Sequence, residues 1–386
     1  MNEPIDSETV FLARHQLDTL ITALRGRGYE VVGPTIDQGA IVYSEITSAA
    51  DLPVGWTDDQ QPGRYRLKKR DDDACFGYVV GPHSWKKFLF PPLATVAAAE
   101  RTQNGWVMQT PGSVEDTPRY AFLGVRGCEL AAIQIQDRVF MGGAYTDPTY
   151  ARRREAAFIV AVNCTQAAPT CFCTSMNTGP DCRSGFDLAL TETSTGFVIE
   201  AGSEAGRTLL LELPVSAVTA DQLQVAAAAR QQAVDQIERH LDTDGLRDLL
   251  VNNLNHPQWE DVAERCLSCT NCTMVCPTCF CSTVAEVSDL TGDHVRRERR
   301  WDSCFNIDFS YMNGGIVRNS IRSRYRQWLT HKLGTWQDQF GTSGCVGCGR
   351  CITWCPTEID LTAEVAAIRA TAGRAVVSAS ATEVTP

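Results

Sequence analysis

In the first part of the chain, the order of apolar and polar residues predicts helices that alternate with strands. Apolar side chains recur at helical spacing between residues 7 and 28, and the glycines that end this run predict a helix stop. A second helical pattern covers residues 128–140. Short apolar or alternating runs predict strands at residues 29–32, 41–46, 75–80, 120–125 and 156–162. Helices that alternate with strands favour a mixed α/β body over residues 1–220.

From residue 221 onward the pattern changes to amphipathic helices with few strand signals. The expected helices cover residues 222–241, 245–254 and 316–333. With the first part, this predicts an α+β protein in which a helical domain, residues 221–362, follows the N-terminal α/β domain, residues 1–220. Residues 363–386 begin helical and pass into a run rich in serine, threonine and alanine, which we expect to be a frayed tail.

The composition is that of an ordinary globular protein, with 44% hydrophobic and 21% charged residues. A net charge of −11 argues against general binding to nucleic acids or to anionic membranes. No apolar run is long enough to span a bilayer, and the acidic N-terminus lacks a signal pattern, so we expect a cytoplasmic location. In that compartment the 17 cysteines are expected to stay reduced and to serve metal or redox chemistry.

Two cysteine runs in the last third of the chain share one spacing. Residues 266–277 and 345–356 each read C-x2-C-x2-C-x3-C-P, the ligand spacing of ferredoxin-type [4Fe–4S] clusters. The cysteines are Cys266, Cys269, Cys272 and Cys276 in the first run and Cys345, Cys348, Cys351 and Cys355 in the second. Zinc sites usually pair two C-x2-C elements or add histidine. The repeated run therefore predicts two [4Fe–4S] clusters and an electron-transfer protein.

The fourth cysteine of each run is expected to ligate the other cluster, as in two-cluster ferredoxins. We therefore assign the first cluster to Cys266, Cys269, Cys272 and Cys355. The second cluster is assigned to Cys345, Cys348, Cys351 and Cys276.

Nine cysteines lie outside these runs, and some belong to a short internal repeat. Residues 169–173 and 277–281 both read Pro-Thr-Cys-Phe-Cys. Two interpretations fit: the dense thiolates ligate a third iron–sulfur cluster, or they are small buried side chains packed around the other two. The candidate ligands of a third cluster are Cys164, Cys171, Cys173 and Cys182. The sequence gives no definite role to Cys75, Cys128, Cys279, Cys281 and Cys304.

Two other features have competing interpretations. Residues 294–332 carry nine Lys and Arg against three acidic residues. This basic stretch could bind an acidic partner or a phosphate-bearing cofactor, compensate the charge of the clusters, or form a solvated helix face.

Cys128 follows an expected strand and opens an expected helix, a position where a nucleophile can lie. An alternative hypothesis is therefore that the N-terminal body is an enzyme that uses Cys128 or the Cys171/Cys173 dithiol. No histidine accompanies Cys128 in sequence. No Walker loop or correctly ordered Gly-x-Gly-x-x-Gly is present, so a nicotinamide or flavin site is not predicted.

Motifs outside the cysteine runs make the chain resemble one family along nearly its full length. They include residues 62–67 and 124–130, Gln136-Asp137-Arg138, Asn163-Cys164, and residues 301–304 and 344–351. The chain resembles the β, iron–sulfur, subunit of NAD(P)-linked [NiFe] hydrogenases of the sulfhydrogenase type. It is also similar to the electron-transfer subunit of anaerobic sulfite reductase. The long link between the runs resembles the α-helical ferredoxin domain of succinate dehydrogenase iron–sulfur subunits.

The resemblance implies an electron relay with no catalytic residue of its own. Its partners would be a flavin subunit that exchanges electrons with NAD(P), and the small and large [NiFe] hydrogenase subunits that handle H2. In the alternative, the same relay feeds a sirohaem sulfite reductase subunit. The two interpretations differ in partners and not in the chemistry of this chain.

Overall fold

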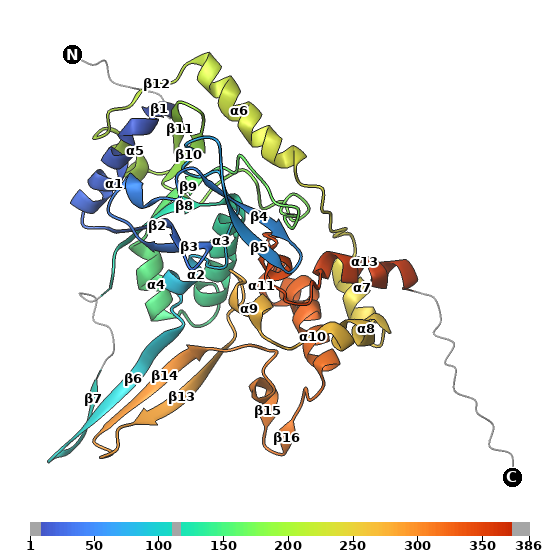
Figure 1. The fold of residues 1–386 in the computed structure, drawn as a ribbon. Helices are drawn as coiled ribbons and strands as arrows, with labels where there is room; N and C mark the ends of the chain where they lie inside the picture. Colours follow the sequence, from blue (N-terminus) through green and yellow to red (C-terminus); the bar gives the residue numbers. More distant parts are fainter. Residues whose placement is uncertain (1–8, 110–116, 373–386) are drawn as a thin grey trace, which may run out of the picture.

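The first part of the chain is built around an eight-stranded mixed sheet in a computed structural model that describes residues 9–109 and 117–372 (Figure 1). The strands are β1 (Thr9–Ala13), β2 (Glu30–Asp37), β3 (Ala40–Glu45), β8 (Tyr120–Val125), β9 (Phe158–Val162), β10 (Leu188–Glu192), β11 (Gly196–Ala201) and β12 (Ser216–Ala217). Their order is β12-β1-β11-β10-β9-β8-β2-β3. The central strands β2, β8, β9 and β10 run parallel, and the outer pairs are antiparallel.

Helices cover both faces of this sheet because its strands carry apolar side chains on both sides. In β8, Ala121 and Leu123 lie in one core cluster and Phe122 in another. The first cluster includes α1 (Leu17–Gly26) and α5 (Glu204–Leu210), and the second includes α2 (Lys86–Leu89), α3 (Gly127–Met141) and α4 (Pro148–Glu155). The body is therefore a helix–sheet–helix sandwich, and the prediction of mixed helices and sheets is confirmed.

Two expectations for the body were wrong. Residues 9–13 form a strand and not the start of a helix, because Val10 and Leu12 enter one core while Phe11 enters another; residues 7 and 8 lie outside the described residues. Residues 75–80 are buried, as expected, but form no strand. The Glu192 carboxylate accepts the backbone N–H groups of residues 75 and 76, and Asp58 accepts that of residue 79. Carboxylates thus take the place of a strand partner.

An arm projects from the body (Figure 1). It is a four-stranded sheet of β6 (Leu93–Thr102), β7 (Gly105–Gln109), β13 (Ser282–Ser288) and β14 (His294–Trp301), in the order β13-β14-β6-β7. Two shorter hairpins join β4 (Trp56–Gln61) to β5 (Arg64–Lys69) and β15 (Tyr311–Met312) to β16 (Gly315–Ile316). The expectation of few strands between the cysteine runs was wrong. β14 is polar and arginine-rich, and it is a strand because it pairs with β6 and β13.

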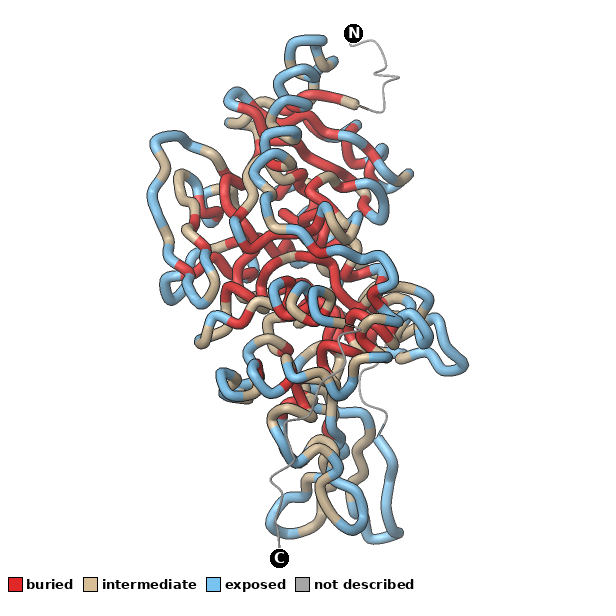
Figure 2. The backbone as a smooth tube through the Cα atoms, turned by 90° about the vertical axis from the view of Figure 1, so that its right-hand side faces the viewer, coloured by how far each residue is buried: buried red, intermediate tan, exposed pale blue. Residues whose placement is uncertain are grey.

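The C-terminal part is helical, with short helices around an aromatic core. It contains α7 (Leu246–Asn252), α8 (Gln258–Arg265), α9 (Asn271–Met274), α10 (Ile321–Thr330), α11 (Trp336–Phe340), α12 (Arg350–Thr353) and α13 (Leu361–Thr371). Trp259, Tyr325, Trp328 and Ile368 lie in its core. Buried segments continue from the sheet into this part, whereas the end of the arm is exposed (Figure 2). None of the helices within the described ranges is long and apolar enough to cross a membrane.

The packing does not follow the expected domain limits at residues 220 and 363. α6 (Ala220–Asp235), expected in the helical domain, packs Ala226 against Phe11 and Val198 of the N-terminal sheet. Residues 363–371, expected to fray, belong to α13 and bury Val365 and Ile368. The remainder of the expected tail, residues 373–386, lies outside the described residues.

Candidate metal centres

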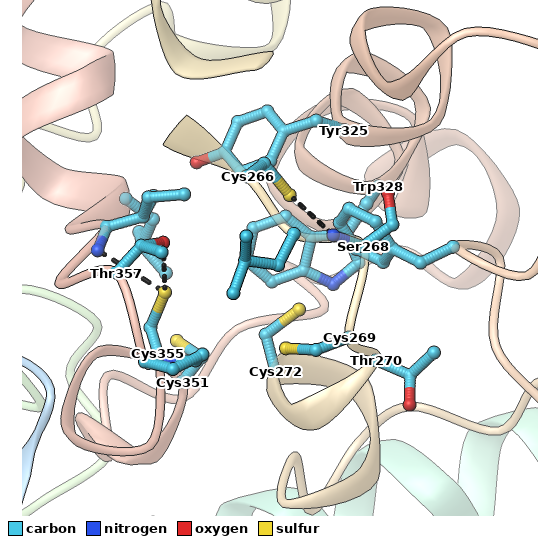
Figure 3. Close-up of a pocket in the computed structure, with 15 residues that line it drawn as sticks. Cys266, Ser268, Cys269, Thr270, Cys272, Tyr325, Trp328, Cys351, Cys355 and Thr357 are labelled. Carbon is cyan, nitrogen blue, oxygen red and sulfur yellow. Dashed lines mark hydrogen bonds between the residues drawn. The ribbon is translucent and has the colours of Figure 1, made fainter. Parts of the chain in front are cut away.

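Five cysteines from the two runs line one pocket (Figure 3). Four of them are the thiols assigned to the first cluster, Cys266, Cys269, Cys272 and Cys355. α8 ends directly before Cys266, α9 carries Cys272, and α12 ends shortly before Cys355. Cys351 also reaches the pocket wall. The thiols that we assigned to the first cluster thus meet across a long stretch of sequence, and their role as ligands stays a prediction.

The backbone beside these thiols is strained and donates to sulfur. Ser268 and Thr270 have φ angles of 50° and 69°, which residues with a side chain rarely adopt. The N–H of Ser268 lies 3.4 Å from Cys266 Sγ, and the N–H of Ile359 lies 3.3 Å from Cys355 Sγ. Such N–H donors stabilise thiolates and tune the potential of a bound cluster.

Aromatic side chains line this pocket. Phe305, Tyr325 and Trp328 lie in its wall. Burial raises the pKa of both Cys266 and Cys272, and neighbouring thiols raise it further. Buried thiols that face one another are costly as free thiolates, and bound metal removes that cost by neutralising their charge.

The second group of thiols is Cys345, Cys348, Cys351 and Cys276. Burial raises the pKa of Cys351 well above its ordinary value, and Cys345, Cys348, Cys276 and Cys272 raise it further. The N–H of Gly347 lies 3.4 Å from Cys345 Sγ. Gly347 has a φ of 64°, and a Cβ there would lie 2.6 Å from a carbonyl oxygen of the N-terminal body. The second run therefore needs this glycine to approach the body.

The first group of thiols lines a pocket. Within residues 9–109 and 117–372, no group of three or more His, Cys, Asp or Glu side chains that could hold a single metal ion is found. In a [4Fe–4S] cluster each iron takes its own thiolate, so the ligands surround a core and do not meet at one point. The thiols of Cys266, Cys269, Cys272 and Cys355 surround a pocket in this way.

A third group of thiols lies near the start of α3. It includes the four candidates Cys164, Cys171, Cys173 and Cys182. Burial raises the pKa of Cys173, and the charges of Cys171 and Cys164 add to this. Cys128 joins the group, facing Cys173 and also Cys348 of the second run. Burial raises the pKa of Cys128 well above its ordinary value, which disfavours the nucleophile alternative.

Lys332 is a buried cation beside the second group. It is 2% exposed, and its Nζ lies 3.2 Å from Cys276 Sγ, 3.1 Å from Thr278 Oγ1 and 3.1 Å from the Gly344 carbonyl oxygen. It belongs to a π-helical turn, His331–Thr335, a rare geometry that is frequent at functional sites. Among the interpretations of the basic stretch, this contact favours compensation of cluster charge at Lys332.

Other basic residues of that stretch form ion pairs within the chain. Arg297 pairs with Glu286 at 2.6 Å, and Arg300 pairs with Glu298 at the same distance. Arg322 lies 3.3 Å from a carboxylate oxygen of α8. These arginines are compensated locally, so they do not form a free basic surface.

A buried ion pair joins the second run to the body, and the sequence did not reveal it. Arg350 pairs with Glu129 of α3, 221 positions away, and both side chains are at most 1% exposed. Arg350 also donates to the Gly81 carbonyl at 2.8 Å. Glu129 accepts from Tyr43 at 3.0 Å and from Trp85 at 2.9 Å. Both residues lie in motifs noted above, but the sequence gives no signal that pairs them.

Comparison with known proteins identifies the domain that carries both cysteine runs. Residues 265–359 match the family model of the 4Fe-4S dicluster domain. The chain is 33% identical over 250 residues to sulfhydrogenase 2 subunit beta of Pyrococcus furiosus, a match that covers 64% of this chain and 73% of the relative. No solved structure matches this chain. The dicluster match confirms the prediction of an iron–sulfur domain in the C-terminal part and indicates two [4Fe–4S] clusters.

Proposed function

Because the chain belongs to the family of sulfhydrogenase beta subunits, we propose that it is the iron–sulfur electron-transfer subunit of a hydrogenase complex. Two [4Fe–4S] clusters supply one-electron redox chemistry when bound. The chain's own residues hold thiolates, exclude water and set local charge. This relay role needs no catalytic residue in the chain.

The observation that carries this proposal is the pocket shared by the two cysteine runs. Cys355 lies beside Cys266, Cys269 and Cys272 in its wall, as the crossed ligation of two-cluster ferredoxins requires. We assign these four thiols to the first cluster. Those of Cys345, Cys348, Cys351 and Cys276 are assigned to the second.

The partners follow from the family and from the chemistry of a relay. An electron relay needs a donor and an acceptor, and we propose a flavin subunit that exchanges electrons with NAD(P) on one side. On the other side we propose the small and large subunits of a [NiFe] hydrogenase. A cytoplasmic location fits thiolate ligation, because reducing compartments keep cysteines available to metals.

The third group of thiols is the candidate site of a third cluster. Cys164, Cys171, Cys173 and Cys182 are its proposed ligands; in support, burial together with Cys171 and Cys164 raises the pKa of Cys173, and burial together with Cys164 raises that of Cys182. Iron content tests the number, because two clusters give about eight iron atoms per chain and three give about twelve.

The proposal is tested by anaerobic affinity purification from the native host, with mass spectrometry of the bound proteins. A flavoprotein together with hydrogenase small and large subunits is expected. A sirohaem protein in their place would contradict the hydrogenase assignment and move the relay to sulfite reduction. A chain recovered without partners would contradict both.

Cysteine variants test the ligand assignment separately from the partners. Cys269→Ser should lower the iron content by about four atoms per chain and remove one electron paramagnetic resonance (EPR) signal. Cys75→Ser is the matched control, because Cys75 is a buried thiol beside Glu192 and lies in the sheet core, away from both runs. Full iron content in Cys269→Ser would contradict the assignment.

A further inference from the structure

A pair of thiols, Cys281 and Cys304, lies at the base of the arm and belongs to none of the three groups above. Cys281 directly precedes β13, and Cys304 follows the end of β14. The ladder pairs Ser282 with Trp301, and the Asp302 N–H donates to the Cys281 carbonyl at 2.8 Å. This register brings the two cysteines into the wall of one pocket.

The pair opens on a pocket separate from the one in Figure 3. Arg318, Lys332, Phe280 and Trp336 are among the residues of its wall. Cys281 and Cys304 are partly exposed, whereas the neighbouring Cys279 is buried. A wall with cationic and aromatic side chains favours a small anionic ligand over a neutral one.

The surroundings shift the pKa values of the two thiols in opposite directions. The thiol and the N–H of Cys304 donate to Cys281, which lowers the pKa of Cys281, and the ammonium groups of Lys332 and Lys86 lower it further. The same hydrogen bond, together with burial, raises the pKa of Cys304. An accessible thiolate with a second thiol beside it is the arrangement of dithiol exchange sites.

Two buried ammonium groups lie beside this pair. Lys86 is 4% exposed and donates to the carbonyls of Cys276 and Cys279, at 2.9 and 3.0 Å. Burial lowers the pKa of Lys86, and the thiols of Cys279, Cys276 and Cys281 act in the opposite direction.

We propose that Cys281 and Cys304 form a redox-active dithiol that reduces small anionic disulfides bound in this pocket. The Cys281 thiolate attacks one sulfur of the disulfide, forms a mixed disulfide and expels the first thiolate product. Cys304 then loses its proton and attacks the Cys281 sulfur, which closes the Cys281–Cys304 disulfide and expels the second product. The dithiol loses two electrons and two protons, and the bound disulfide gains both as two thiols.

The exchange reaction needs only the two thiols of Cys281 and Cys304. The later reduction of their disulfide back to two thiols rests on the proposed function, because the two electrons would come from the electron relay of the complex.

The test uses the full-length, iron-loaded chain under anaerobic conditions and the anionic aromatic disulfide 5,5′-dithiobis(2-nitrobenzoate). The expected result is rapid release of about two equivalents of thiolate product per chain, with iron unchanged. Peptide mapping should find a disulfide between Cys281 and Cys304. Cys281→Ser should abolish the rapid release, and Cys304→Ser should stop at a mixed disulfide on Cys281 with one equivalent released. Cys75→Ser should react as the wild type does.

Three results would overturn the proposal. The first is a loss of about four iron atoms in Cys281→Ser, which would make this thiol a cluster ligand. The second is rapid release that persists in Cys281→Ser, and the third is a wild-type peptide map without the Cys281–Cys304 disulfide. Because iron content and the EPR signals of the clusters are recorded on the same samples, failure of the exchange is distinguishable from failure of the electron-transfer assignment.

Discussion

Replacement of Lys332 by methionine should lower the reduction potential of the second cluster. The ammonium of Lys332 lies 3.2 Å from the sulfur of Cys276 and is almost fully buried. A reduced cluster carries one more negative charge than an oxidised one, so a nearby cation stabilises the reduced form and raises the potential. Methionine has a similar volume and removes the charge.

The size of the effect follows from Coulomb's law. At about 6 Å between the ammonium and the centre of the cluster, with an effective dielectric constant of about 20, the interaction is about 3 kcal/mol. For a one-electron couple this corresponds to about 120 mV. In a water-like dielectric of about 80 the same charge would contribute only about 30 mV. The prediction for Lys332→Met is therefore a shift of about −120 mV.

The assay is a redox titration followed by EPR. It is carried out in a Cys269→Ser background, where the second cluster is expected to be observed without the first. Lys332→Gln separates two causes, because the amide can still donate a hydrogen bond to sulfur but carries no charge. If charge dominates, glutamine and methionine should give similar shifts. A shift of about 30 mV or less in Lys332→Met would refute the reasoning, because it would mean that water screens this site.

Two further predictions concern the body. Glu129→Gln leaves Arg350 buried without a counter-charge and should cost about 3–5 kcal/mol of folding free energy, measured by chemical denaturation; a loss under about 1 kcal/mol would contradict this. Burial raises the pKa of Asp58 to about 6, so its contribution to stability is full below about pH 4 and is lost as the pH rises to about 6. The Tm of Asp58→Asn should therefore rise relative to that of the wild type between about pH 4 and 6 and stay at a constant offset above about pH 7, whereas parallel curves throughout would show an ordinary carboxyl pKa.

The sequence predicted features that depend on short-range spacing. The cysteine runs fix thiols two or three residues apart, so a spacing rule was enough to predict the dicluster domain that the family model also finds. The helix at residues 128–140 and the strand at residues 120–125 were predicted for the same reason, since each carries its own periodicity.

Features that depend on distant partners were missed. β14 is too polar to be recognised as a strand, and it forms because β6, almost 200 residues earlier, supplies its hydrogen bonds. The pairing of Glu129 with Arg350 is equally invisible, because neither residue has a local feature that requires the other. Lys332 was one of nine basic residues, and only the three-dimensional fold distinguishes it from the arginines that pair with carboxylates.

These long-range contacts give the two proposed clusters different surroundings. The first pocket lies among aromatic side chains of the helical part, such as Tyr325 and Trp328. The second group lies where the helical part meets the body, between Lys332 and the Glu129–Arg350 pair. Buried positive charge therefore favours reduction of the second cluster over the first. It follows that the difference in potential between the clusters depends on how the body packs against the second run, which gives the N-terminal sheet a role in electron transfer without any catalytic residue.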